Sequence, residues 1–111
     1  MLENQILKQI KQQAKEQRLG DKRAEQFYGL PKSAVYDPPN LANGSETTTP
    51  ITVTGAVLGD FVIVSFSLDL QGIKLTAYVS SANVATCTFS NHTGGAVDLG
   101  SGTLKVRVFK Q

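Results

Sequence analysis

The chain of 111 residues has little of what many functional classes require. It contains no tryptophan, one methionine, one cysteine (Cys87) and one histidine (His92), and aromatic residues make up only 7% of it. A single cysteine excludes an intrachain disulfide, and therefore a small secreted domain stapled by disulfides. A zinc site needs three or four ligands, mostly histidine and cysteine, so this composition argues against one.

Long apolar runs are also lacking. No stretch approaches the roughly 20 apolar residues of a membrane span, and the N-terminal sequence MLENQILKQIKQQ has no continuous apolar core of the kind found in signal peptides. The sequence therefore predicts a protein that is made in the cytoplasm and has no membrane partner.

Neither positive nor negative charge is in large excess, because the formal net charge is only +2. Residues 1–32 carry seven Lys/Arg and four Asp/Glu, whereas residues 33–111 carry four and five. The basic residues near the N-terminus alternate with Gln and Glu, which is typical of a solvated helix face. We therefore expect no nucleic-acid partner.

Residues 1–27 have the composition of a helix, being rich in Gln, Lys, Glu, Leu and Ala. Leu2, Ile6, Leu7 and Ile10 recur at spacings of three and four, which forms one narrow apolar stripe. The stripe either packs on the rest of the same chain or binds a neighbouring molecule. We take these four residues as candidate interface residues.

Residues 28–49 are predicted to form an extended arm. The stretch from Tyr28 to Pro50 carries all four prolines and has neither helical nor strand periodicity. A connection of this length is unusual inside a compact domain. Leu30 and Val35 are among the apolar residues that could dock such an arm on a surface.

Residues 50–111 consist of short β-like runs separated by turn signals, which predicts a small antiparallel β-sandwich or a jelly-roll-like domain. The whole chain is thus expected to be mainly β, with an N-terminal helix and an extended arm. Alternation of apolar and polar residues assigns the following side chains to the core: Ile63, Leu75, Val79, Phe89, Leu104, Val106 and Val108.

The run DFVIVSFSL at residues 60–68 is apolar on both of its faces. A strand of this kind is buried on both sides, and one small core covers only one side. We therefore expect a second copy of the chain or another protein to cover the other face. With Ile63 assigned to the core, the residues predicted for this interface are Val62, Val64, Phe66 and Leu68.

The stretch SNHTGGAVDLGSG at residues 90–102 gathers His92, Asp98 and four glycines. Turns account for the glycines, and neither titratable residue has a visible partner for catalysis. A calcium site built from Asp98, Asn91 and loop carbonyls stays open as an alternative. Cys87 falls on an inward position, where a lone cysteine is inert. The sequence therefore predicts no catalytic, cofactor-binding or metal-binding residue.

Residues 49–109 resemble a short β-module of virion structural proteins from tailed bacteriophages. The similarity lies in the order of GAVLGD, an aliphatic strand, LTAYVSSAN and NHTGGAVDLGSGTLKVRV. In SSANVATCTF the spacing departs from that module, because Ala85 directly follows Val84.

The resemblance implies a non-enzymatic virion protein, made in the host cytoplasm, that decorates the capsid. Its expected partners are other copies of itself, with a trimer favoured over a dimer, and the major capsid protein or another virion protein. The alternative is a tail, neck or fibre component that binds a host carbohydrate or protein. Scattered tyrosines (Tyr28, Tyr36 and Tyr78) do not form the aromatic cluster that carbohydrate binding favours.

Overall fold

The computed structural model describes residues 29–111, and these form six β-strands without a helix. The strands are β1 (Leu30–Tyr36), β2 (Glu46–Thr52), β3 (Phe61–Phe66), β4 (Lys74–Ser81), β5 (Val84–Ser90) and β6 (Gly102–Phe109). They form two three-stranded antiparallel sheets, which we call the first sheet (β1–β6–β3) and the second sheet (β2–β5–β4). The prediction of a mainly β fold is confirmed.

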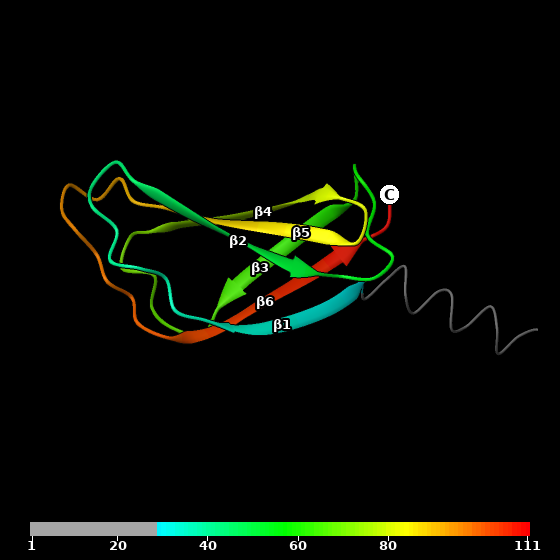
Figure 1. The fold of residues 1–111 in the computed structure, drawn as a ribbon, viewed down its shortest axis with the longest axis horizontal. Helices are drawn as coiled ribbons and strands as arrows, with labels where there is room; N and C mark the ends of the chain where they lie inside the picture. Colours follow the sequence, from blue (N-terminus) through cyan, green and yellow to red (C-terminus); the bar gives the residue numbers. More distant parts are fainter. Residues whose placement is uncertain (1–28) are drawn as a thin grey trace, which may run out of the picture.

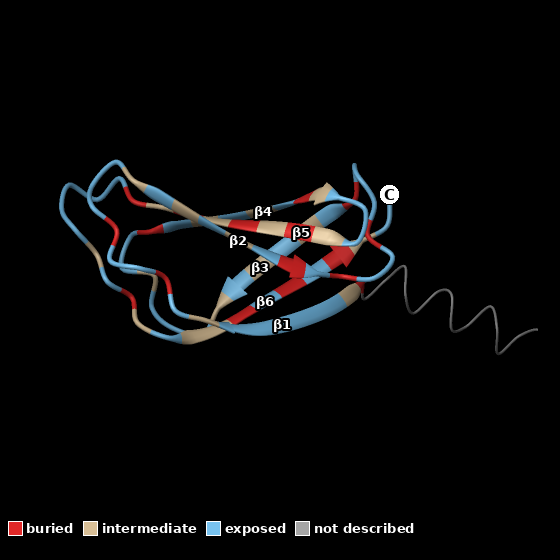
Figure 2. Cartoon of the chain, viewed as in Figure 1, coloured by how far each residue is buried: buried red, intermediate tan, exposed pale blue. Residues whose placement is uncertain are grey.

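The two sheets lie face to face and enclose one hydrophobic core (Figure 1). Buried positions alternate along the central strands β5 and β6 (Figure 2). Phe89 anchors this core, with its ring 5.3 Å from that of Phe66 in an edge-on arrangement and 5.7 Å from that of Tyr36 in a stacked one. The core side chains are Leu41, Ile51, Val53, Ala56, Ile73, Val79, Ala85, Cys87, Phe89, Leu99, Leu104, Val106 and Val108.

Residues 28–49, predicted to form an extended arm, instead contribute to both sheets from residue 30 onward. Leu30–Tyr36 pairs with β6 along its whole length, and β2 begins at Glu46. Both β1 and β2 are edge strands, where a proline removes no ladder hydrogen bond. Pro31 and Pro50 therefore sit inside strands, and the β-domain is longer at its N-terminal side than the predicted boundary at residue 50.

The two faces of β3 are assigned the wrong way round by the sequence analysis. Val62, Val64 and Phe66 lie opposite Val108, Val106 and Leu104 and pack half-buried against the core. Phe61 and Ile63 point outward and are 68% and 62% exposed. Alternation separates the two sets correctly, but both sets are apolar, so the pattern cannot say which one faces the second sheet.

The six strands place their connections at two ends of the domain. Residues 37–45, 67–73 and 91–101 lie at one end, which we call the loop end, on the left in Figure 1. Residues 53–60, the turn between β4 and β5 and the C-terminus lie at the other end. The predicted helical segment 1–27, with Leu2, Ile6, Leu7 and Ile10, lies outside the described residues.

Candidate interaction surface

The loop end is organised by Asn91, which the sequence suggests only as a possible calcium ligand. Its side chain is buried, and Nδ2 donates to the carbonyls of Leu41 and Gly95, both at 2.8 Å. Oδ1 accepts from the backbone N–H of Thr93 at 2.9 Å. Because one amide satisfies groups from two loops, the stretch at residues 90–102 is a packed turn structure.

His92 and Asp98 both point into solvent from this turn structure. Within residues 29–111, no three His, Cys, Asp or Glu side chains are grouped so that they could hold a metal ion. Cys87 lies in the core, where burial raises the pKa of its thiol to about 11. A thiol with so high a pKa is protonated at neutral pH and is a poor nucleophile.

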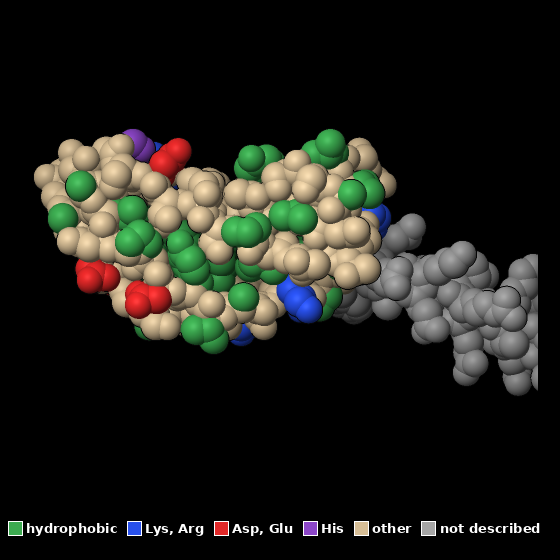
Figure 3. Space-filling view, viewed as in Figure 1, with side chains coloured by type: hydrophobic (Ala, Val, Ile, Leu, Met, Phe, Trp, Pro, Cys, Tyr) green, Lys and Arg blue, Asp and Glu red, His purple; other side chains and the backbone are tan. Residues whose placement is uncertain are grey.

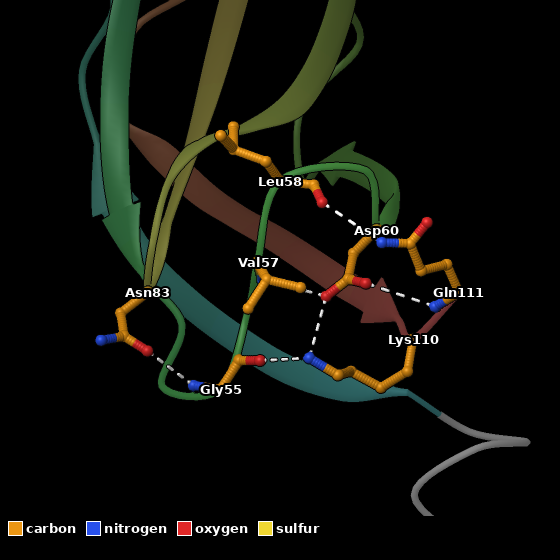
Figure 4. A network of polar contacts seen from close by, with 7 residues as sticks. All are labelled: Gly55, Val57, Leu58, Asp60, Asn83, Lys110 and Gln111. Carbon is orange, nitrogen blue, oxygen red and sulfur yellow. Dashed lines mark hydrogen bonds and ion pairs between the residues drawn. The ribbon is translucent and has the colours of Figure 1, made fainter.

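The opposite end is held by Asp60, whose carboxylate is fully enclosed (Figure 4). It accepts hydrogen bonds from the backbone N–H of Val57 at 3.0 Å and of Gln111 at 3.2 Å, and it pairs with Lys110 Nζ at 3.0 Å. Lys110 also donates to the carbonyl of Gly55. These contacts connect the C-terminus to the loop that leads into β3.

The pKa of Asp60 is lowered from its ordinary value of 3.8, first by the hydrogen bond from the Val57 backbone and then by Lys110 and the Gln111 backbone, against the opposing effect of burial. The hydrogen-bond partners of this carboxylate, Val57, Lys110 and Gln111, all belong to the same domain, so Asp60 stabilises the fold. The sequence alone does not reveal this role of Asp60, because its partner Lys110 lies 50 residues further along the chain.

The outward side of the first sheet exposes large apolar side chains. Its outward side chains are Pro31, Ser33 and Val35 on β1, Thr103, Lys105, Arg107 and Phe109 on β6, and Phe61, Ile63 and Ser65 on β3. We call this surface the outer face of the first sheet. Phe61, Ile63 and Val35 are all more than 60% exposed, which places large apolar side chains next to two cations.

A shallow groove of about 500 Å³ crosses this outer face. Pro31 and Ser33 form one side of it, Ile63 and Ser65 form the other, and Lys105 and Arg107 lie between them on the central strand. Pro31, Arg107 and Ile63 occupy one row across the three strands, and Ser33, Lys105 and Ser65 occupy the next. The groove therefore combines positive charge, hydroxyl groups and an apolar rim.

Comparison with protein-family models, with curated proteins and with solved structures found no match to this chain. No helix within residues 29–111 is long and apolar enough to cross a membrane.

Of the predicted interface residues, Val62, Val64 and Phe66 contribute to the core of this domain. Leu68 lies after β3 and is 39% exposed. The exposed apolar side chains of β3 are instead Phe61 and Ile63, on the opposite side of the strand.

Proposed function

We propose that this protein is a non-enzymatic structural component of a virion, a decoration protein that binds the assembled head of a tailed bacteriophage and stabilises it. In this proposal the two facing sheets act as a β-sandwich module. The resemblance of residues 49–109 to phage virion modules supports the proposal that the protein is part of a virion. The observation that carries the proposal is the apolar outer face of the first sheet.

Phe61 and Ile63 lie two residues apart on the outer side of β3, and most of each side chain is exposed. Complete burial of a side chain of this size contributes about 1.5–3 kcal/mol. Contiguous exposed apolar surface on a small domain marks a contact with another molecule. We infer that a second copy of the chain covers this face in the assembled protein.

Cyclic symmetry covers the same face on every copy without producing a filament. A trimer fits the local threefold positions of an icosahedral shell, and we favour it over a dimer. The remaining partner is the major capsid protein or another virion protein, which the N-terminal segment would contact through Leu2, Ile6, Leu7 and Ile10.

Self-association is tested by light scattering of the full chain across micromolar concentrations. We expect an oligomer, and we expect the double variant Phe61→Ser/Ile63→Ser to dissociate at least about tenfold more readily, because each wild-type copy hides these side chains from water. Tyr78→Ser is the matched control, since Tyr78 is 60% exposed on the second sheet. A strictly monomeric wild-type chain, or equal loss in both variants, contradicts the proposal.

Particle binding is tested separately, by co-sedimentation of the full chain with heads that lack it. The full chain should bind and should raise the temperature at which the heads release their contents. A chain without residues 1–27 should keep its oligomeric state and lose binding. Undiminished binding of the shortened chain contradicts the role given to the N-terminal segment.

A further inference from the structure

Four strands lie at the edges of the two sheets, and three of them carry a proline, a lysine or a β-bulge, each of which discourages pairing with another chain. β1 contains Pro31 and Lys32, and β2 contains Pro50. The register of β4 shifts between Val79 and Ser81. Figure 3 shows Lys and Arg side chains (blue) along the lower margin of the domain, where β1 lies. β3, with the sequence FVIVSF, has no proline, no charge and no register shift, so it is the unprotected edge within residues 29–111.

The backbone of β3 directs hydrogen-bonding groups to this edge at alternate residues. The N–H of Ser67 donates to the carbonyl of Thr103 at 3.0 Å, which continues the register of β3 with β6 by one row. Residues that bond to a given neighbour alternate along an antiparallel strand. Odd-numbered residues of β3, such as Ile63, therefore direct their N–H and C=O groups towards β6, and Val62 and Val64 direct theirs away from it. Among the described strands, β3 pairs with β6 alone.

The other edge of the first sheet shows how such groups are blocked. In the same pattern, the β6 residue opposite Pro31 bonds to β3, so the ring nitrogen of Pro31 lies on the free edge of β1. Proline has no N–H, and this edge therefore lacks a donor that an added strand would need. On β3, Val62 and Val64 keep both the donor and the acceptor.

The side chains of β3 are compatible with pairing to an identical strand. Two-fold symmetry brings residues near the axis against their own copies, so a charged residue there would meet a like charge. No residue from Phe61 to Phe66 is charged. The outer side of the strand exposes most of Phe61 and Ile63, and the inner side, with Val62 and Val64, is only half-buried. Both sides therefore gain apolar burial when a strand is added.

We propose that β3 pairs antiparallel with β3 of a second copy across a two-fold axis, so that two first sheets form one six-stranded sheet. This inference rests on the self-association proposed above and adds which strand makes the contact. Val62 of each copy bonds to Val64 of the other, and Ile63 lies against its own counterpart on the outer face. Phe61 then lies diagonally across from Ile63 of the second copy.

The contact is two-fold and therefore produces a dimer. The trimer favoured above follows from the symmetry of an icosahedral shell, whereas the edge of β3 by itself joins two copies. The mass of the associated species distinguishes the two.

The test is a pair of charge variants in the full chain, read by sedimentation equilibrium. Ile63→Lys and Ile63→Glu should each raise the dissociation constant of the dimer at least about tenfold, because two like charges meet at the axis. An equimolar mixture of the two variants should associate at least about tenfold more tightly than either alone, because a lysine then meets a glutamate. Val35→Lys is the matched control on β1 of the same face, where Val35 is 78% exposed, and should leave association unchanged.

Hydrogen exchange of the wild type locates the contact. The amides of Val62 and Val64 should exchange at least about tenfold more slowly above the association concentration than below it, and the amide of Ile63, which bonds to β6, should change less.

A monomeric wild type would overturn the proposed function and this inference together. A trimer, or a mixture of variants that does not recover association, would overturn the β3 contact alone. Slow exchange of Val62 and Val64 at every concentration would show that another segment of the same chain occupies the edge, and would overturn the inference as well.

Discussion

The outer faces of the two sheets cover the same core and yet present different chemistry. On the second sheet, the rows across β2, β5 and β4 read Thr48, Thr88, Thr76 and Pro50, Thr86, Tyr78. The corresponding rows of the first sheet contain Lys105, Arg107 and Ile63. A threonine-rich surface combines β-propensity with hydroxyl groups that water solvates. The outer face of the second sheet is therefore mostly hydrophilic, whereas the outer face of the first sheet exposes large apolar side chains.

Both sheets pack on one shared hydrophobic core, and Phe89→Ala should have the largest effect on it. Phe89 is fully buried and contacts the rings of Tyr36 on β1 and Phe66 on β3. We expect a loss of about 3–5 kcal/mol in the free energy of unfolding, because the cavity lies between the sheets. Chemical denaturation measures it. A loss below about 1 kcal/mol would show that the sheets are not held by a common core.

Asn91→Ala tests whether the loop end is a fixed part of the fold. The substitution removes two donors and one acceptor from a buried position. We expect a loss of about 2–3 kcal/mol in unfolding free energy. Thr93→Ala, which removes a hydroxyl at an exposed position of the same turn, is the control with a smaller effect. Equal stability of the wild type and the Asn91 variant would contradict the role given to this amide.

Lowering the pH should destabilise the first sheet before the second, and we expect this effect to be smaller than those of the two substitutions above. Asp60 is the last residue before β3, and its carboxylate accepts a hydrogen bond from the Val57 backbone in the same loop. The pKa of Asp60 is lowered in the folded state. A lowered pKa means that the ionised carboxylate stabilises the fold above the unfolded-state value of 3.8, and that this contribution is lost as the pH falls through the folded-state pKa. Asp60→Asn should therefore be less stable than the wild type at neutral pH and should lose less stability on acidification.

The measurement is denaturation of both chains at neutral pH and at about pH 3. Amide hydrogen exchange at the same two values locates the change, and we expect β3 and the C-terminus to lose protection before β5. Identical acid sensitivity of the wild type and Asp60→Asn would show that this carboxylate does not stabilise the start of β3.

Much of the fold could be predicted from alternation, because burial on one side of a strand leaves a period of two in the sequence. Val79, Phe89 and Leu104 are buried as predicted. The strand β1 could not be predicted, because Pro31 and the two prolines that follow the strand indicate a loop, and because its partner β6 lies about 70 residues away. Proline is compatible with a strand only at an edge, and edge position is a property of the assembled sheet.

The candidate surface was predictable in part. The sequence showed that both sides of β3 are apolar, and it therefore indicated a partner. It could not show that Val62 and Val64 face the second sheet while Ile63 faces outward, because either choice buries an apolar set. The groove could not be predicted either, since Lys105 and Ser33 become neighbours only through the pairing of β1 with β6.

The most direct test of the account is hydroxyl-radical footprinting of the full chain at concentrations above and below its association. Each sample reports on both outer faces at once. We predict that Phe61 and Ile63 are oxidised more slowly in the associated state and that Tyr78, on the second sheet, is oxidised at the same rate in both. Protection of Tyr78 without protection of Phe61 and Ile63 would contradict the assignment of the first sheet as the surface through which copies of this protein associate.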